Sequence, residues 1–369
     1  MNTTHPLISS KNKLKLAVFG LNVSSGCSMT DVPGTLQVTW DESAEIAKLA
    51  EKAGIEAIIP VARWKGMGGK INFNHRNFET LTWAAALAAI TSKIGVFATV
   101  HVPTVHPVRV AKECATIDLI SDGRFGLNVV AGWNERELAM FGLDQRDHAD
   151  RYDYADEWIE LCKELWTQKE EFDFSRKYFR STGLYSEPKP LQHPHPLLMS
   201  AGNSERGQLY AAQHTDINFV VAPDSLAAGA IAKDVKRLAR ENFKKEISVF
   251  GQAYVVCRDT EAEAKDFFNY YVHERGDQEG VENLLDTLIP NSKSALNTGW
   301  RAMADNMIAG YGAIPLIGTA EQVVDGMVDF ANAGIDGITL SWVNYKSGIS
   351  QFEQDILPLM QEAGLREEV

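Results

Sequence analysis

The sequence predicts an α/β fold, a (β/α)8 TIM barrel with insertions. Three observations favour it. Short apolar runs alternate with longer helical segments along the chain. The runs are apolar almost throughout, which is typical of strands buried on both faces of a parallel sheet. The strand–helix unit also repeats eight times, the number that closes such a sheet into a barrel. A doubly wound open sheet is the alternative, and it is disfavoured because no G-x-G-x-x-G motif follows the first apolar run.

Each expected strand is a short apolar run that stops at a glycine, a proline or a polar turn. The eight runs span residues 13–20, 55–61, 94–100, 124–130, 197–202, 216–221, 247–257 and 335–343. The helices between them carry the usual end signals, because Pro107 suits a first helical turn and Gly54 and Gly123 suit helix ends. Clear helical stretches cover residues 41–54, 77–93, 107–123, 151–168 and 320–334.

Two insertions interrupt this rhythm in what we expect to be a single domain over 14–369, behind an N-terminal tail at 1–13. The first, near 142–195, contains a long helix and a predicted hairpin with alternating aromatic residues at 172–181. The second, near 271–312, has little strand character. A long irregular segment inside a barrel is usually functional, so we expect the second insertion to form a lid over the site.

Composition narrows the functional classes. The chain carries 36 basic and 49 acidic residues, a formal charge of −13, and its longest basic run is Lys244–Lys245. Binding to nucleic acid or to an anionic membrane needs a basic patch, so neither partner is expected. We find no secretory leader and no apolar run of roughly 18 residues that would span a membrane. A cytoplasmic enzyme is the resulting expectation.

Metal and hydrolase chemistry find no support in the sequence. The four cysteines lack paired spacing and the histidines lack ligand spacing, so neither a disulfide framework nor a metal site is expected. Cys114 and Cys162 fit helix interiors, whereas Cys27 lies in a predicted loop and is the candidate reactive thiol. No G-x-S-x-G elbow is present. The pattern suits an enzyme in which a cofactor performs the chemistry.

Polar residues at the carboxyl ends of the strands are the first candidates for the site of a barrel. Asn128 stands out, because a buried amide without a partner is costly; it needs a protein or a ligand partner, and we favour a ligand. Ser204 suits both a helix N-cap and an anion site at a helix N-terminus. Arg63 is equally well explained by a solvated loop, and Thr99 by the strand preference of β-branched residues.

Several ordered stretches together resemble one family. They are "ATIDLISDGRFGLNVVAGWNERELAMFG", "RYDYADEWIELCKELWT", "SEPKPLQHPHP", "SAGNSERG" and "IGTAEQVVDGMVDFANAGIDGITL". From about residue 14 to the C-terminal helix, the chain resembles the bacterial-luciferase-like flavin-dependent monooxygenases. Within that family, "RWKGMGGK" and "AGNSERG" most resemble the pyrimidine oxygenase group.

The resemblance implies a luciferase-like, two-component monooxygenase. A separate NAD(P)H:flavin reductase would supply FMN as FMNH2, and this chain would insert one oxygen of O2 into a small organic substrate through a flavin peroxide. A pyrimidine or related heterocycle is the first expected substrate, with sulfones, alkanesulfonates and halogenated aromatics as alternatives. The same barrel would also suit a deazaflavin-dependent dehydrogenase or a non-catalytic flavin-binding protein, and both stay open. Family members are usually homodimers or homotetramers, so one of these is expected.

The resemblance also assigns roles to matching positions. Thr99 and Asn128 would line the oxygen pocket and act in catalysis. The expected cofactor contacts are Ala62, Arg63, Asn128, Glu137, Arg151, Tyr152 and Ser204, the last at the phosphate. The residues around Arg63 differ from the usual family pattern, which points to a different substrate. The resemblance does not define the substrate pocket, for which we expect Trp64, His101, His106, Trp133 and Trp342.

Overall fold

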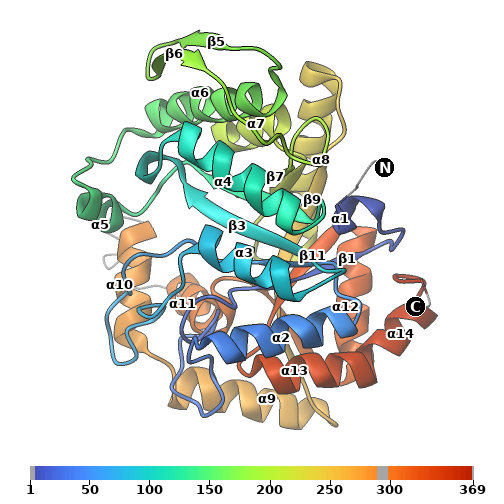
Figure 1. The fold of residues 1–369 in the computed structure, drawn as a ribbon. Coiled ribbons are helices and arrows are strands. Elements are labelled where there is room, and N and C mark those ends of the chain that lie inside the picture. Colours follow the sequence, from blue (N-terminus) through green and yellow to red (C-terminus); the bar gives the residue numbers. More distant parts are fainter. Residues whose placement is uncertain (1–4, 289–297, 368–369) are drawn as a thin grey trace.

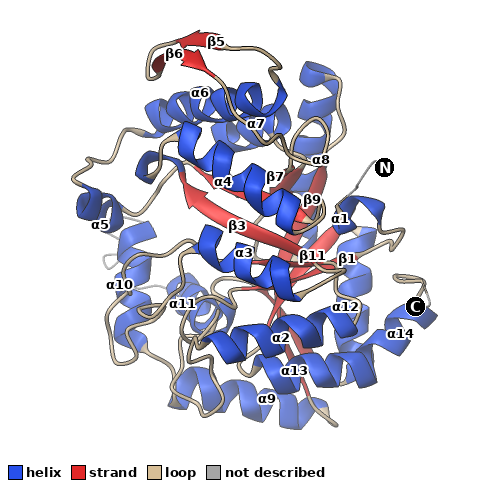
Figure 2. Cartoon of the chain, viewed as in Figure 1, coloured by secondary structure: helices blue, strands red, loops and turns tan. Residues whose placement is uncertain are grey.

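The computed structural model describes residues 5–288 and 298–367, and a closed parallel barrel forms its centre (Figures 1 and 2). The barrel strands are β1 Lys15–Phe19, β2 Ala57–Ile59, β3 Gly95–His101, β4 Phe125–Val130, β7 Leu197–Ser200, β8 Ile217–Phe219, β9 Ser248–Cys257 and β11 Gly337–Ser341. They pair in the order β1-β2-β3-β4-β7-β8-β9-β11, and β11 pairs back with β1. This closure confirms the (β/α)8 barrel and excludes the open sheet, which would leave two unpaired edges.

Helices cover the outside of the barrel (Figure 1). The longer ones are α2 Trp40–Lys52, α3 Thr80–Ile90, α4 Pro107–Ile120, α6 His148–Thr167, α7 Glu205–His214, α8 Ser225–Phe243, α9 Glu261–Asn269, α10 Gln278–Leu288, α11 Thr298–Gly310 and α12 Ala320–Asn332. The shorter ones are α1 Pro6–Ser9, α5 Glu135–Leu138, α13 Tyr345–Gln351 and α14 Leu357–Glu362. Across the described part of the chain, no helix combines the length and the apolar character that a membrane crossing requires.

The barrel interior is filled by the inward-facing half of the strand residues, as the two-residue period of a strand requires. They include Ala17, Phe19, Ala57, Ile59, Phe97, Met199, Ile217, Phe219 and Phe250. Leu7 of α1 packs into the same cluster, and the His5 ring lies edge-on to Phe97 at 5.3 Å. Residues 6–9, which were expected within a tail, therefore form a plug at the amino-terminal end of the barrel, because Leu7 buries its apolar side chain there.

One strand was not predicted. β10, Ile314–Gly318, pairs in parallel with Ala253–Cys257 in the second half of β9. β9 has ten residues, so its first half closes the barrel while its second half extends beyond it and carries β10. Pro315 lies inside this run, and a proline argues against a central strand but is compatible with an edge strand.

The two insertions lie at opposite sides of the barrel mouth (Figure 1). The first forms the predicted antiparallel hairpin, β5 Phe172–Ser175 with β6 Arg180–Leu184, and this hairpin lies over α6. The second contains α10 and α11. Part of the expected lid, residues 289–297, lies outside the described residues.

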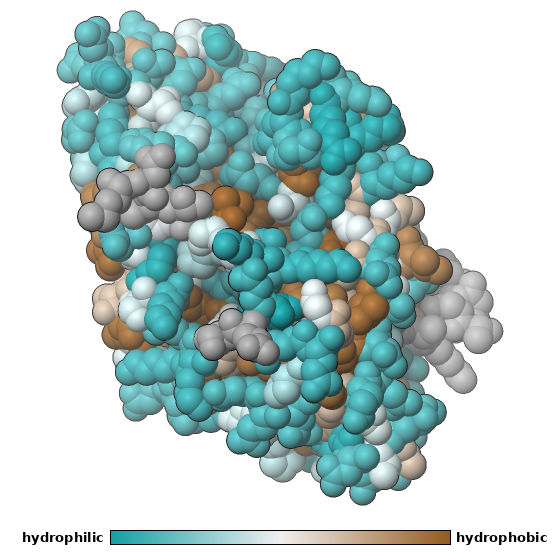
Figure 3. All heavy atoms as spheres, turned by 90° about the vertical axis from the view of Figure 1, so that its right-hand side faces the viewer, coloured by the Kyte–Doolittle hydropathy of each residue, from teal (hydrophilic) through white to brown (hydrophobic). Residues whose placement is uncertain are grey.

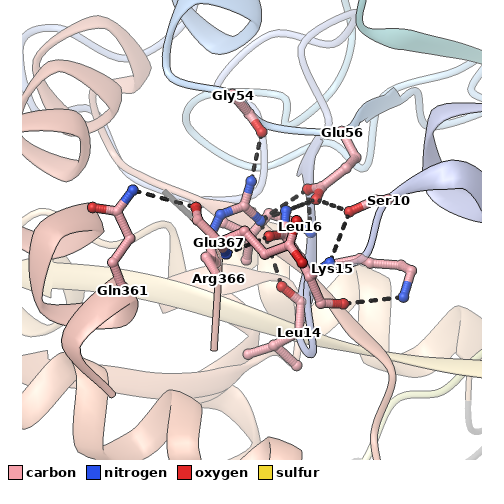
Figure 4. Close-up of polar contacts among 10 residues, drawn as sticks. Ser10, Leu14, Lys15, Leu16, Gly54, Glu56, Gln361, Arg366 and Glu367 are labelled. Atoms are coloured by element: carbon pink, nitrogen blue, oxygen red, sulfur yellow. Dashed lines mark hydrogen bonds and ion pairs between the residues drawn. The ribbon is translucent and has the colours of Figure 1, made fainter. Parts of the chain in front are cut away.

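A buried ion pair ties the C-terminal segment to the start of β2 (Figure 4). Arg366 Nη1 lies 3.0 Å from Glu56 Oε2, and Arg366 Nη2 donates to the Gly54 carbonyl at 2.6 Å. Glu56 also accepts from the backbone N–H of Leu16 at 2.9 Å and from the Ser10 hydroxyl at 2.8 Å. The face that carries both termini is mainly hydrophilic, with apolar residues in separate patches (Figure 3). The network therefore joins both ends of the chain to the barrel on this face.

Candidate active site

A cavity of about 430 Å³ opens at the carboxyl ends of the barrel strands. Much of its lining is apolar and includes Phe19, Ile59, Met199 and Phe219. Of the residues predicted for the site, it brings together Ala62, Arg63, Thr99, His101, Asn128, Trp133, Arg151 and Tyr152. An apolar cavity with a few converging polar groups is the usual form of a small-molecule site.

Thr99 and Asn128 face each other on neighbouring strands of the barrel, β3 and β4. The Thr99 hydroxyl donates to the Pro60 carbonyl at 2.6 Å and accepts from Asn128 Nδ2 at 3.3 Å. The amide oxygen of Asn128 is buried and has no hydrogen-bond partner within the described residues. Because a buried acceptor without a donor costs free energy, a ligand that donates to this oxygen would be stabilised.

Glu137 lies behind the cavity wall, at the first turn of α5, and is fully buried. Its Oε1 accepts from the backbone N–H groups of Trp64 at 2.9 Å and Lys65 at 3.2 Å. The expected direct contact of Glu137 with the cofactor finds no support in this position, since its side chain does not line the cavity. It fixes the segment that follows β2, which in turn places Arg63.

Arg63 connects three parts of the site. Its Nη1 lies 3.5 Å from Glu137 Oε1, and its Nη2 donates to the Tyr311 hydroxyl at 2.8 Å. Its guanidinium carbon lies 5.3 Å from the centre of the Trp133 ring, within the range of a cation–π contact. Arg63 is only 4% exposed, so the solvated-loop interpretation is wrong.

His101 is buried at the wall between this cavity and a smaller one of about 130 Å³. Burial lowers the pKa of His101 to about 4; Glu137 opposes this shift and Arg63 adds to it. The ring is therefore neutral at neutral pH. Trp64 lies on the rim of the smaller cavity, 41% exposed, with its ring edge-on to Phe141 at 5.0 Å.

The N-terminus of α7 lies next to Tyr152 of the cavity lining, although Ser204 itself is not among the lining residues. Ser204 is its N-cap and accepts from the Gly207 N–H at 3.1 Å. Burial raises the pKa of Tyr152, and a hydrogen bond with Ser204 opposes the shift. A Cβ on Gly202 would lie 2.6 Å from Gly207 Cα and 2.8 Å from the Tyr152 hydroxyl, so this approach requires glycine. Free N–H groups at a helix N-terminus favour an anion.

Arg151, one residue before Tyr152, also lines the cavity. Its Nη1 donates to the Gly132 carbonyl at 2.7 Å, whereas its Nε is buried without a partner in the described structure. The guanidinium is thus oriented by a neutral group and keeps donors for a ligand.

Two predicted pocket residues lie elsewhere. His106 is exposed and caps α4, its Nδ1 accepting from the Val108 N–H at 3.3 Å. Trp342 is buried outside the barrel, with its ring 6.0 Å from Tyr345 and 6.2 Å from Phe352. The expectation that both line the substrate pocket is wrong. Trp342 follows Leu340 by two residues, so both side chains point away from the barrel interior, into the layer between the strands and the helices.

Several residues of the cavity were not predicted. They are chiefly Gln252 of β9, Leu288, Met307 and Tyr311. Gln252 is buried in a strand and donates to the Gly310 carbonyl at 3.3 Å. Like Asn128, it is an amide within an apolar run, and this feature of the sequence could have identified it. Tyr311 has a left-handed backbone, with φ of 59°, in the turn that Gly310 and Gly312 flank after α11.

The structure also bears on the candidate reactive thiol and on metal binding. Cys27 is buried, and burial raises its pKa to about 12, so the thiolate needed for reaction is not formed near neutral pH. Burial and the raised pKa both argue against a reactive Cys27 thiol. Over residues 5–288 and 298–367, no group of three or more His, Cys, Asp or Glu side chains is arranged to hold a metal ion.

The amino-acid sequence is similar to a family of known proteins and to individual members of it. The luciferase-like monooxygenase family matches residues 17–337. Pyrimidine monooxygenase RutA of Acinetobacter baylyi is 30% identical over 353 residues, covering 94% of this chain and 95% of that protein. RutA of Caulobacter vibrioides is 29% identical over 354 residues, covering 94% and 99%.

Solved structures share the fold. Riboflavin lyase RcaE superposes with a TM-score of 0.86 at 22% identity, over 96% of this chain and 92% of that one. The long-chain alkane monooxygenase LadA gives a TM-score of 0.84 at 21% identity, over 97% and 93%. At such identities these structures establish the shared barrel.

Proposed function

This chain belongs to the luciferase-like monooxygenase family and is a flavin-dependent monooxygenase, and from that premise we propose that it is the oxygenase of a two-component system. A separate NAD(P)H:flavin reductase provides reduced FMN, and the chain inserts one atom of O2 into a small organic substrate. The relatives that are about 30% identical are named pyrimidine monooxygenases, which makes a pyrimidine or related heterocycle the first substrate to test. We place the reaction in the cytoplasm, where NAD(P)H is available, and expect a homodimer or homotetramer.

The residues at the barrel mouth fit a reduced flavin. The free amide oxygen of Asn128 can accept a hydrogen bond from the ring system, beside the backbone of Ala62. At the other end, the N-terminus of α7 with Ser204, the Tyr152 hydroxyl and the unused donors of Arg151 suit a phosphate group. When bound, reduced flavin supplies the electrons that activate dioxygen.

The chain's own residues bind, orient and shield. The Thr99 hydroxyl holds the Asn128 amide so that its oxygen is available, and preorganised dipoles of this kind stabilise charge that develops during a reaction. Phe19, Met199 and Phe219 keep water from the floor of the cavity. His101 is neutral, so it adds a polar group to the wall without adding charge.

The observation that carries this proposal is the buried, unpartnered oxygen of Asn128 at the mouth of the barrel. The test combines the purified protein with FMN, a flavin reductase, NADH and uracil, and measures oxygen uptake and product. We expect substrate-dependent uptake above that of the reductase alone, and a strong decrease for Asn128→Ala at unchanged thermal stability. Uptake that never exceeds the reductase background, for uracil and for a wider panel of heterocycles, would contradict the proposal.

A further inference from the structure

Arg63 carries a buried positive charge that its protein contacts use only in part. A guanidinium has five N–H donors. The described structure uses one toward Tyr311 at 2.8 Å and one toward Glu137 at 3.5 Å, and Nε has no hydrogen-bond partner. The Arg63 side chain is only 1% exposed, so bulk water reaches few of the remaining donors. Arg63 also lines both cavities, from which a ligand could approach it.

Glu137 compensates this charge incompletely. Charge-assisted N–H···O bonds are usually about 2.7–2.9 Å long, so the contact at 3.5 Å is weak. The same carboxylate oxygen also accepts from the backbone N–H groups of Trp64 and Lys65. A buried ion whose partner is distant is costly, and a ligand anion would remove that cost.

The other groups of the wall do not supply the missing negative charge. Two carboxylates, Glu79 and Glu113, line the smaller cavity, but both have other partners. Glu79 caps α3, and Glu113 pairs with Arg109 at 2.8 Å, so neither is paired with Arg63 in the described structure.

His101 is neutral, and its Nδ1 is 3.7 Å from Glu137 Oε2. Arg151 is a second guanidinium, and its nearest partner is the Gly132 carbonyl rather than a carboxylate. A flavin phosphate would engage the α7 end with Arg151, which leaves Arg63 as the cation available to a substrate.

We propose that Arg63 is the specificity-determining residue of the site and anchors a small, planar substrate through a carboxylate. The planar guanidinium matches a carboxylate in a two-point contact, and the Trp133 ring restrains its plane from one side. The substrate class is therefore an aromatic or heteroaromatic carboxylate, of which a pyrimidine carboxylate is one example. This inference rests on the proposed function for the reaction, but the anion site itself exists without turnover.

The test is a binding measurement with benzoate and its neutral counterpart benzamide. Each is titrated into the protein–FMN complex and followed by the visible absorption of the flavin, and into flavin-free protein by calorimetry. The wild type should bind benzoate at least about tenfold more tightly than benzamide. Arg63→Gln should weaken benzoate binding roughly 10- to 100-fold, the usual value of a charge-assisted contact, and leave benzamide unchanged.

Control variants separate the anchor from general damage. Arg237→Gln removes an exposed arginine of α8 and should change neither affinity. Arg63→Lys should retain part of the benzoate preference, because lysine keeps the positive charge but cannot make the two-point contact of a guanidinium. The double variant Arg63→Gln/Glu137→Gln removes both buried charges and keeps an amide oxygen for the two backbone donors, so it reports on the anchor even if the single variant misfolds.

The outcomes distinguish the two proposals. Equal affinity for benzoate and benzamide in the wild type, binding of neither, or a benzoate preference that survives in both glutamine variants would overturn the carboxylate anchor. Failure of the wild type to bind FMN would contradict the proposed function instead, and the calorimetric comparison on flavin-free protein would still decide the role of Arg63.

Discussion

Substitution of Arg366 by methionine tests how strongly the chain end is held. Its side chain is 3% exposed and that of Glu56 is 6% exposed. Removing one partner of a buried ion pair costs about 3–5 kcal/mol. Glu56 would keep three donors, at 2.9 Å from Leu16 N, 2.8 Å from Ser10 and 2.6 Å from Asn12, so the low end of that range applies. The backbone carbonyls of Gly54 and Leu14 also lose a donor, and we therefore expect a loss of about 3–4 kcal/mol.

Urea unfolding followed by circular dichroism measures this loss. The matched control is Arg237→Met on the exposed face of α8, which should stay within about 0.5 kcal/mol of the wild type. The double variant Glu56→Gln/Arg366→Met should lose less than the single variant, because no uncompensated charge is left. If Arg366→Met unfolds at the same urea concentration as the control, the buried pair does not hold the C-terminus and the reasoning is refuted.

Three further predictions concern titration, thiol reactivity and cofactor binding. The pKa of His101 is about 4 in the folded protein and 6.5 ordinarily, so the unfolded state binds the proton first as the pH falls. The free energy of unfolding should therefore decrease by roughly 3 kcal/mol from pH 6.5 to pH 4. His101→Gln should remove this part of the decrease, as measured by urea unfolding at each pH. Cys27 and the other three cysteines are buried, so a thiol reagent should label the native protein far more slowly than the urea-unfolded protein, and rapid labelling of native Cys27 would contradict its raised pKa. Ser204→Ala should lose about 1 kcal/mol of helix capping whereas Ser204→Gly should lose a few tenths. If the hydroxyl contacts the phosphate, both variants should weaken FMN binding equally in fluorescence titrations; weakening by alanine alone would assign the effect to the cap.

The fold was largely predictable because parallel strands that are buried on both faces appear in the sequence as nearly continuous runs of apolar residues. The exceptions have physical reasons. β10 contains Pro315 and lies at the edge of the sheet, and a proline within a short apolar run argues against predicting a strand there. The plug at residues 6–9 is one helical turn, too short to show periodicity, and it depends on the contact of Leu7 with the barrel interior.

Residues of the candidate site could be predicted where a single residue stood out in the sequence. Asn128 was identifiable as a polar residue in a buried strand, and its free oxygen agrees with that interpretation. The prediction for Trp342 was wrong because a position near a strand end does not by itself show which way the side chain points. Tyr311 was not found because its contact with Arg63 joins residues far apart in the chain. Glu137 was identified as important, but only the structure shows that it acts on the backbone after β2.

Isotope labelling tests the central claim most directly. The protein is supplied with FMN, a flavin reductase, NADH and labelled dioxygen, together with uracil, a pyrimidine carboxylate and related heterocycles, and the products are analysed by mass spectrometry. The account predicts a product that carries one labelled oxygen atom, formed by the wild type and strongly reduced for Asn128→Ala. Products without labelled oxygen, or none from any of these substrates while FMN is bound, would contradict it.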